Sequence, residues 1–210
     1  MIFDFEALPA QARYKLAVST VIPRPIAWVV TRDAAGTVNA APYSFFNVFS
    51  HDPMVMGVGC GERPGEAGAK DTLANIRAVG EFVINIVTED TLDAMNITAA
   101  DFPPGHDEVA EAGLSTAPSS KISVPRIAES PVAFECVTHD LVPIGPHTLV
   151  LGRVVAMFLR DDCVLNAERH HVDAAKLNAV GRLWGAGGYV RLSDRMDFRR
   201  VTPEDVARGR

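Results

Sequence analysis

The feature that most constrains the fold is a succession of short runs rich in valine, isoleucine and aromatic residues, separated by turn residues. The main runs cover residues 25–32, 54–60, 81–89, 132–144 and 147–161. Short strands with turn signals between them are typical of sandwiches and barrels, whereas strands that alternate with long helices indicate a doubly wound sheet. We therefore expect a mainly β protein built on a closed barrel, with a few short helices.

Three short helices are predicted between these runs. The first begins at Asp71, a suitable capping residue, and ends at Gly80. A second is predicted within residues 91–102 and a third within residues 167–180. Residues 101–130 show no regular pattern and are too long for an ordinary connection, so we expect them to form an arm or lid. All of these elements are assigned to one domain, residues 1–210.

Composition limits the classes of partner. The chain has 210 residues and a formal net charge of −6, which disfavours sequence-independent binding to nucleic acid. No apolar run approaches the roughly 20 residues that span a membrane, and the first residues do not resemble a signal peptide. The three cysteines are scattered, which disfavours a disulfide framework. We expect a cytoplasmic protein that binds neither nucleic acid nor membranes.

The usual nucleotide and metal fingerprints are missing from the sequence. It has neither GxGxxG after a strand nor GxxxxGK[ST], so it signals neither a Rossmann domain nor a P-loop. His170 and His171 are adjacent, which directs their side chains apart, and we expect no metal site there. An anion site in this acidic chain must therefore be built locally, from side chains and loop amides.

Two segments carry residues from which such a site can be built. Residues 39–53 read NAAPYSFFNVFSHDP, and residues 70–77 read KDTLANIR at the start of a predicted helix. A phosphate needs several short donors and a cation. The candidates are Ser44, Asn47, Lys70 and Thr72. The alternatives are turn chemistry for the serine and the asparagine, and a solvated charge for the lysine.

In their order along the chain, these segments resemble the flavin reductase-like family of FMN-binding split barrels, and in particular its flavoredoxin-like members. The resemblance rests on IPRPIAWVVT, on the two segments above and on EFVINIV. It continues through ESPVAFEC, GPHTLVLGRV and VGRLWGAGGYVR, and covers about residues 18–192. It implies a Greek-key split β-barrel that forms a homodimer and holds flavin at the subunit interface.

The resemblance also implies which residues hold the FMN. Thr31 and the four candidates named above are placed near the phosphate and the ribityl chain, and Ala41 and Ser50 are also assigned to the cofactor site. For the flat ring the chain offers Trp28, Pro42, Tyr43, Phe45 and Phe46. Because side chains alternate along a strand, these residues cannot all face one pocket. We expect one or two of them to touch the ring.

Three further residues have a predicted role and an alternative. Arg24 lies between two prolines and is expected to reach an anionic edge of the flavin; the alternative is a surface or interface salt bridge. His147 matches a histidine that the family associates with the nicotinamide side of the flavin, so we expect it to be catalytic; the alternative is a structural role. Tyr189 is expected near the cofactor, with core packing as the alternative.

The resemblance implies an FMN-binding oxidoreductase that takes hydride from NADH or NADPH and passes electrons to free flavin or to a redox partner protein. FAD is the less favoured flavin, and nothing in the sequence separates NADH from NADPH. In such proteins the cofactor performs the chemistry, and the protein orients and tunes it. The alternative is a flavoredoxin-like electron carrier that holds FMN without itself oxidising NAD(P)H.

Overall fold

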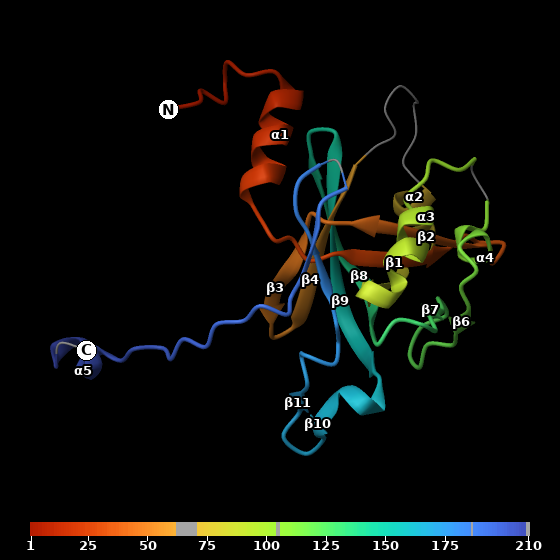
Figure 1. Cartoon of the computed structure of the whole chain (residues 1–210). Coiled ribbons are helices and arrows are strands. Elements are labelled where there is room, and N and C mark those ends of the chain that lie inside the picture. Colours follow the sequence, from red (N-terminus) through yellow and green to blue (C-terminus); the bar gives the residue numbers. More distant parts are fainter. Residues whose placement is uncertain (62–70, 104–105, 186, 209–210) are drawn as a thin grey trace.

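The main feature of the fold is one antiparallel sheet of seven strands. The structure, a computed structural model, describes residues 1–61, 71–103, 106–185 and 187–208. The strands are β1 (Ala27–Arg32), β2 (Val38–Tyr43), β3 (Phe46–His51), β4 (Met54–Gly61), β5 (Glu81–Ile86), β8 (Val132–Ile144) and β9 (His147–Leu159). Their order across the sheet is β2-β1-β5-β8-β9-β4-β3 (Figure 1). The prediction of a mainly β protein with a few short helices is confirmed.

Both faces of the sheet are covered at β1, which explains why its residues 27–30 are all apolar. Val30 points into a buried cluster on one face, and Val29 points into a second cluster on the other. The first cluster also contains side chains of α3 (Leu92–Ile97), and the second contains side chains of α2 (Asp71–Val79). Because successive side chains of a strand face opposite ways, apolar residues at consecutive positions of β1 fill both clusters.

Helix α2 was predicted from the sequence, whereas helix α1 (Ala10–Thr20) was not. Helix α2 begins at Asp71, so this acid lies in its first turn. The helix ends at Val79 and is followed by Gly80, whose φ of 77° suits a residue without a side chain. The sequence does not predict α1, because its buried residue is Val18 and it has almost no apolar face. No helix in the described ranges is long and apolar enough to cross a membrane.

The arm, residues 101–130, is anchored to the sheet by a few buried residues. It contains α4 (Glu108–Glu111), β6 (Thr116–Ala117) and β7 (Arg126–Ile127). Val124 and Ile127 are buried in the same cluster as Val30. The backbone N–H of Ile127 also donates to the side-chain oxygen of Asn85 at 3.1 Å. The arm therefore forms part of the core, which favours the arm over the lid.

The helix predicted within residues 167–180 is wrong. The chain there forms turns and a small hairpin of β10 (Val164–Asn166) and β11 (His171–Val172). His170 and Asn178 have φ values of 57° and 48°, in the left-handed region that interrupts a right-handed helix. The periodic pattern of the sequence gives no sign of these two turns.

A further hairpin brings the C-terminal part of the chain back to the region before β1. It consists of β12 (Val180–Arg182) and β13 (Tyr189–Arg191). Arg182 forms an isolated antiparallel bridge with Arg24, in which the two residues exchange backbone hydrogen bonds of 2.8 and 2.9 Å. This bridge places two arginine side chains next to each other.

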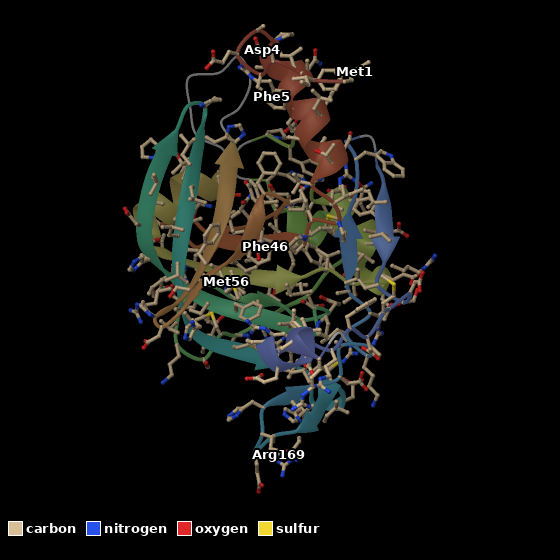
Figure 2. All side chains as sticks on the ribbon, turned by 90° about the vertical axis from the view of Figure 1, so that its left-hand side faces the viewer. Met1, Asp4, Phe5, Phe46, Met56 and Arg169 are labelled. Atoms are coloured by element: carbon tan, nitrogen blue, oxygen red, sulfur yellow. The ribbon has the colours of Figure 1, made fainter. Side chains whose placement is uncertain are left out.

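The two ends of the chain lie outside the barrel. Helix α1 stands at one end of the sheet, and the C-terminal segment runs away from the body to α5 (Pro203–Ala207) (Figure 1). Figure 2 shows Met1 and Phe5 at one end of the molecule and Arg169 at the opposite end. The C-terminal segment carries large exposed apolar side chains, among them Met196 and Phe198.

Gly152 of β9 tests how tightly the core is packed. A Cβ atom at this position would collide with the ring of Phe82 and would lie 3.1 Å from Cβ of Cys136. We expect Gly152→Ala to lower the free energy of unfolding by about 1–3 kcal/mol, because overpacking a filled core forces neighbouring side chains out of their rotamers. Urea denaturation measures this change.

Gly185→Ala is the matched control. Its added Cβ would lie at an ordinary contact distance, 3.9 Å, from Cγ2 of Val18. We expect the free energy of unfolding to stay within about 0.5 kcal/mol of the parent protein. Equal effects of the two substitutions would contradict the tight packing around Gly152.

Candidate functional site

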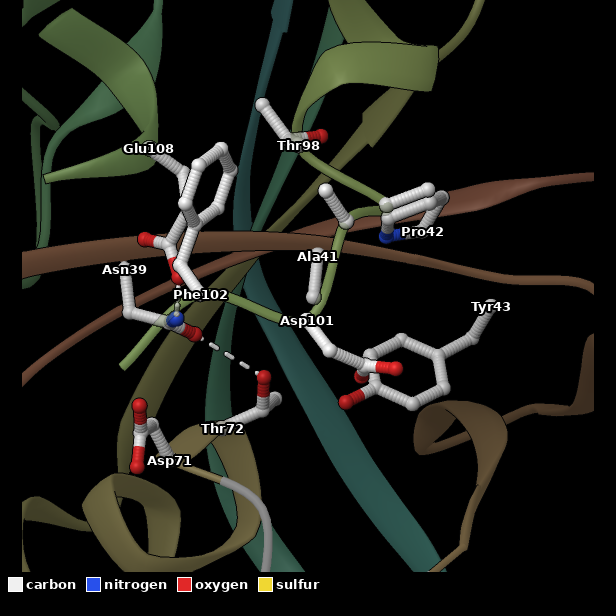
Figure 3. A pocket seen from close by; sticks show the side chains of 12 residues that line it. Asn39, Ala41, Pro42, Tyr43, Asp71, Thr72, Thr98, Asp101, Phe102 and Glu108 are labelled. Atoms are coloured by element: carbon white, nitrogen blue, oxygen red, sulfur yellow. Dashed lines mark hydrogen bonds between the residues drawn. The ribbon is translucent and has the colours of Figure 1, made fainter. Parts of the chain in front are cut away.

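A hydrogen-bonded polar network joins β1, β2, α2 and the arm. The sheet register places Asn39 opposite Thr31. The amide nitrogen of Asn39 donates to Oε1 of Glu108 at 2.7 Å, and its oxygen accepts the hydroxyl of Thr72 at 2.9 Å (Figure 3). The hydroxyl of Thr31 lies 3.4 Å from the same oxygen. One buried amide therefore connects four elements of the fold.

The network fixes the direction of the Thr72 hydroxyl. Thr72 is buried, and its hydroxyl hydrogen is directed at Asn39. Asn39 cannot turn its amide without losing the hydrogen bond to Glu108. In this arrangement the Thr72 oxygen can accept a hydrogen bond from a ligand, and it can donate one only after rotating away from Asn39.

A first cavity opens beside this network. It is lined by β2, the start of α2, residues 98–102 after α3, and the arm. Three of the lining side chains are acids: Asp71, Asp101 and Glu108 (Figure 3). Burial raises the pKa of Glu108, and the nearby charge of Asp71 adds a smaller effect in the same direction. The described wall of this cavity is therefore acidic.

An acidic wall has consequences for the ligands that the first cavity can hold. A phosphate there requires a cation to offset the carboxylates. The cation that the sequence offers is Lys70, which lies outside the described residues. Among the described residues there is no group of three or more His, Cys, Asp or Glu side chains placed to hold a metal ion.

Tyr43 forms part of the wall between the first cavity and a second one. Burial raises the pKa of its hydroxyl, which therefore remains protonated and able to donate. This hydroxyl is buried and has no partner at ordinary hydrogen-bond geometry among the described residues, although the Thr72 side chain lies close enough to lower its pKa slightly. Because a buried hydroxyl without a partner is costly, this position suits an acceptor atom of a ligand.

The second cavity, of about 240 Å³, lies between α1, the β12–β13 hairpin and the end of β2. Its wall combines two cations, Arg24 and Arg182, with two aromatic rings, Tyr14 and Tyr189. Ser44 belongs to the same wall, and its hydroxyl oxygen accepts from Nε of Arg24 at 3.2 Å. The second cavity is thus cationic and aromatic, in contrast to the first.

Arg24 is held in place by backbone carbonyls. It is 6 % exposed, and one terminal nitrogen donates to the carbonyl oxygens of Val18 at 2.6 Å and Val21 at 3.0 Å. Burial lowers the pKa of Arg24, and the positive charge of Arg182 lowers it further. Within the described residues Arg24 has no salt bridge, so its surface-pair alternative is not realised there.

The predicted ring contacts are distributed over different environments. Pro42 and Tyr43 line both cavities, and Ala41 lines the first. Trp28 is fully buried, and its indole N–H donates to the hydroxyl of Thr98 at 2.9 Å. Trp28 lines neither cavity, so a contact with a flavin ring stays a prediction that its burial does not favour.

The alternation that divides the ring candidates between two faces does not run through residues 43–48, because these residues do not form one continuous strand. β2 ends at Tyr43, the chain bends at residues 44–45, and β3 begins at Phe46. Asn47 and its neighbour Val48 both lie on the edge strand β3 and are exposed. The bend separates Tyr43 and Ser44, which line the second cavity, from the residues of β3.

Several predicted site residues lie away from both cavity walls: besides Trp28, these are Thr31, Phe45, Asn47, Ser50 and His147. Asn47 is exposed, and its side-chain oxygen accepts from the next backbone N–H; Ser50 accepts from the backbone N–H of Asp52 in the same way. His147 is exposed at the start of β9, and its ring centroid lies 6.3 Å from that of Phe45. Their roles toward a cofactor stay predictions.

Sequence reasoning missed several residues that build the site. Glu108 lies in the arm, 69 positions from the asparagine to which it is hydrogen-bonded. Tyr14 lies in the helix that the sequence does not predict. Asn39 and Arg182 stand inside the quoted motifs but were not distinguishable there from ordinary polar residues. The turn signal Asp107, which caps α4, is the local clue to a helix near Glu108.

Comparison with known proteins identifies relatives along nearly the whole chain. Residues 18–175 match the family model described as "Flavin reductase like domain". An uncharacterized protein of Deinococcus radiodurans is 43% identical over 204 residues, which cover 95% of this chain and 89% of the relative.

Two solved structures are similar in fold and sequence. Nitrilotriacetate monooxygenase component B from Bacillus cereus has a TM-score of 0.88 and 32% identity, covering 94% of this chain and 98% of the other. The 2-nitrobenzoate 2-nitroreductase of Pseudomonas fluorescens also has a TM-score of 0.88 and 32% identity, covering 97% and 98%.

This chain belongs to the flavin reductase-like family, whose split-barrel fold it shares. The predictions of the family and of the split β-barrel are confirmed. Membership supports a flavin-related oxidoreductase with a flavin cofactor.

Glu108→Gln tests the electrostatics of the first cavity. Burial raises the pKa of Glu108 in the folded protein. The protonated Glu108 carboxyl therefore makes its full contribution to stability below the pKa of glutamate in the unfolded chain, about 4.3. This contribution is lost as the pH rises through the higher pKa of Glu108 in the folded protein. Because glutamine does not ionise, we expect the variant to gain stability relative to the parent protein between pH 4 and pH 8. Urea denaturation at several pH values measures the difference.

Glu168→Gln is the control for this experiment, because Glu168 is exposed. Its stability relative to the parent protein is expected to change little over the same pH range. A Glu108→Gln difference that is constant with pH would contradict the assignment of a raised pKa to this carboxyl group.

Proposed function

We propose that this protein binds FMN along the shared wall of the two cavities and uses it to take hydride from NADH or NADPH. In this proposal the phosphate-bearing chain lies toward the first cavity, and the flat ring lies against Pro42 and Tyr43. The electrons pass to free flavin or to a redox partner.

One observation carries the proposal: the two cavities share a wall formed by Pro42, Tyr43 and Ala99. One side of this wall offers short polar groups such as the hydroxyl of Thr72, and the other side offers rings and cations. A flavin enzyme needs this combination, because its cofactor has a polar chain and a flat ring, and a second compound must approach that ring.

The residues around the first cavity fit FMN if a cation offsets the negative charge of its acids. The buried Tyr43 hydroxyl and the first backbone amides of α2, a helix of nine residues, offer donors. The acids of the first cavity oppose a phosphate, so the fit requires a nearby cation, and Lys70 is the one that the sequence predicts. FMN, when bound, supplies the acceptor for a hydride.

The remaining tasks fall to side chains of this chain. Ser44 accepts a hydrogen bond from Arg24, which leaves its own hydroxyl hydrogen available to an acceptor on a ligand. The rigid network around Asn39 holds Thr72 in one orientation. We retain His147 as the candidate on the nicotinamide side, because its exposed ring lies near Phe45 at the edge of the barrel.

The similar solved structures support the same class of reaction. Their names, nitrilotriacetate monooxygenase component B and 2-nitrobenzoate 2-nitroreductase, both denote oxidoreductases or parts of them. The alternative function is an electron carrier that holds FMN and receives electrons from a protein.

Anaerobic reduction separates the two functions. We expect the FMN-loaded protein to lose its visible flavin absorption rapidly when NADH or NADPH is added, because a reductase delivers hydride directly to its cofactor. The measurement is a stopped-flow absorbance trace with each donor in turn. Free FMN at the same concentration is the control and is expected to bleach much more slowly. Absence of rapid bleaching with both donors would leave the carrier function.

We also propose that the protein is a homodimer. The strand β3 lies at an edge of the sheet and exposes Val48 and Phe49, the latter by 61 %. Phe198 and its neighbours in the C-terminal segment are also exposed. Contiguous exposed apolar side chains of this kind mark interaction surfaces more often than they mark free ones.

Phe49→Asp tests the homodimer. We expect the parent protein to sediment with twice the mass of one chain, and the variant to shift toward the monomer, because a buried carboxylate without a partner is costly in an interface. Phe5→Asp is the control, since Phe5 lies at the N-terminal end of the molecule (Figure 2). A parent protein that sediments as a monomer at micromolar concentration would contradict this proposal.

A further inference from the structure

Two arginines of the second cavity lie side by side. Arg24 and Arg182 are joined by the isolated backbone bridge, and side chains of both line the cavity. Within the described residues neither makes a salt bridge with an aspartate or a glutamate. The chain as a whole has six more acids than bases. The fold therefore holds the two positive charges of Arg24 and Arg182 next to each other despite their mutual repulsion.

The hydrogen bonds that the pair makes leave donors unused. Arg24 donates to two carbonyl oxygens and to Ser44 through two of its three nitrogens. Arg182 donates to the carbonyl oxygen of Gly185 through one nitrogen, at 2.8 Å. Since a guanidinium carries five N–H donors, each arginine keeps donors that no described residue occupies.

The electrostatic setting favours an anion at this position. Burial lowers the pKa of Arg24, and the charge of Arg182 lowers it further, so the protonated form of Arg24 is destabilised by its surroundings. An anion that bridges the two guanidinium groups would remove this penalty. Charge-assisted hydrogen bonds to a carboxylate are among the strongest that side chains make.

The other residues of the second cavity indicate the size and the chemical character of the rest of the ligand. The guanidinium carbon of Arg182 lies 4.5 Å from the ring centroid of Tyr189, which orients the arginine over an aromatic face. Tyr14, Ile26 and Met95 add an aromatic ring and two apolar side chains to a wall that is otherwise mostly polar. A cavity of about 240 Å³ with such walls suits one small ring, and it is too small for a dinucleotide.

We propose that Arg24 and Arg182 bind the carboxylate of a small aromatic acid whose ring lies in the second cavity. The position of this acid beside a flavin rests on the proposed function; the binding of the acid does not. Arg24 anchors the deep end of the site, and Arg182, which is half-buried, closes it from the β12–β13 hairpin.

Calorimetric titration with benzoate tests the proposal, and benzamide serves as the neutral probe of the same shape. The protein is used as purified, with and without added FMN. We expect benzoate to bind at least about tenfold more tightly than benzamide, because the carboxylate makes charge-assisted hydrogen bonds that the amide cannot.

Arg182→Gln is the informative variant. Arg24 is avoided, because its loss would release the carbonyl groups of Val18 and Val21 and could unfold α1. We expect Arg182→Gln to weaken benzoate binding at least about tenfold, to leave FMN affinity unchanged, and to lower thermal stability only slightly through the lost hydrogen bond to Gly185. Arg153→Gln, an exposed position on β9, makes the same change in net charge and is expected to bind benzoate like the parent protein.

Each result either supports or overturns the binding of a carboxylate by Arg24 and Arg182. Equal affinity for benzoate and benzamide, or equal losses in the two variants, would overturn the proposal. A loss of FMN affinity in Arg182→Gln would also overturn it, because the arginines would then serve the flavin. Calorimetry needs no nicotinamide cofactor, so failure of the bleaching experiment and failure of this one are separate results.

Discussion

The side-chain amide of Asn39 is the interaction on which the site depends. It receives the hydroxyl of Thr72 and donates to the carboxylate of Glu108, so that β2, α2 and the arm meet at one buried group. Its position opposite Thr31 follows from the register of the first hairpin. A shift of this register by one residue would turn Asn39 to the other face of the sheet and would leave both partners buried without a hydrogen bond. The geometry of the first cavity is therefore set by strand pairing, and the arm completes it.

The two cavities differ in charge although they share a wall. Carboxylates line the first, and guanidinium groups line the second, with Pro42 and Tyr43 between them. A ligand that spans this wall experiences a change of potential along its length, which fixes its orientation more strongly than shape alone. This polarity is local, since the formal charge of the whole chain is −6. Charge counted over the sequence would therefore suggest that anions are repelled everywhere, while the fold places two arginines together in the second cavity.

Much of the sheet was predictable from the sequence, because each strand carries its own pattern. The pair 132–144 and 147–161 corresponds closely to β8 and β9, and the stop at Gly80 matches the end of α2. The parts that could not be predicted depend on distant contacts. Glu108 gains its role from a residue 69 positions away, and α1 has almost no apolar face to signal it. Residues 167–180 are interrupted by two left-handed residues, neither of them glycine, which leaves no mark in the sequence. The site follows the same division: residues 41–44, which line the cavities, were predicted, whereas Asn39 and the residues of the arm and α1 were not.

The contact between Arg24 and the end of α1 links the docking of this helix to the binding of an anion in the second cavity. The carbonyl oxygens of the last turn of a helix carry partial negative charge, and here two carbonyls at the end of α1 are bound by a single guanidinium group. Any anion that binds this guanidinium draws on the same positive charge that holds the helix end. Binding and helix docking are then coupled, and the coupling is reciprocal by thermodynamic necessity. A change in the first twenty residues of the chain can thus alter affinity in the cavity without touching its ligand.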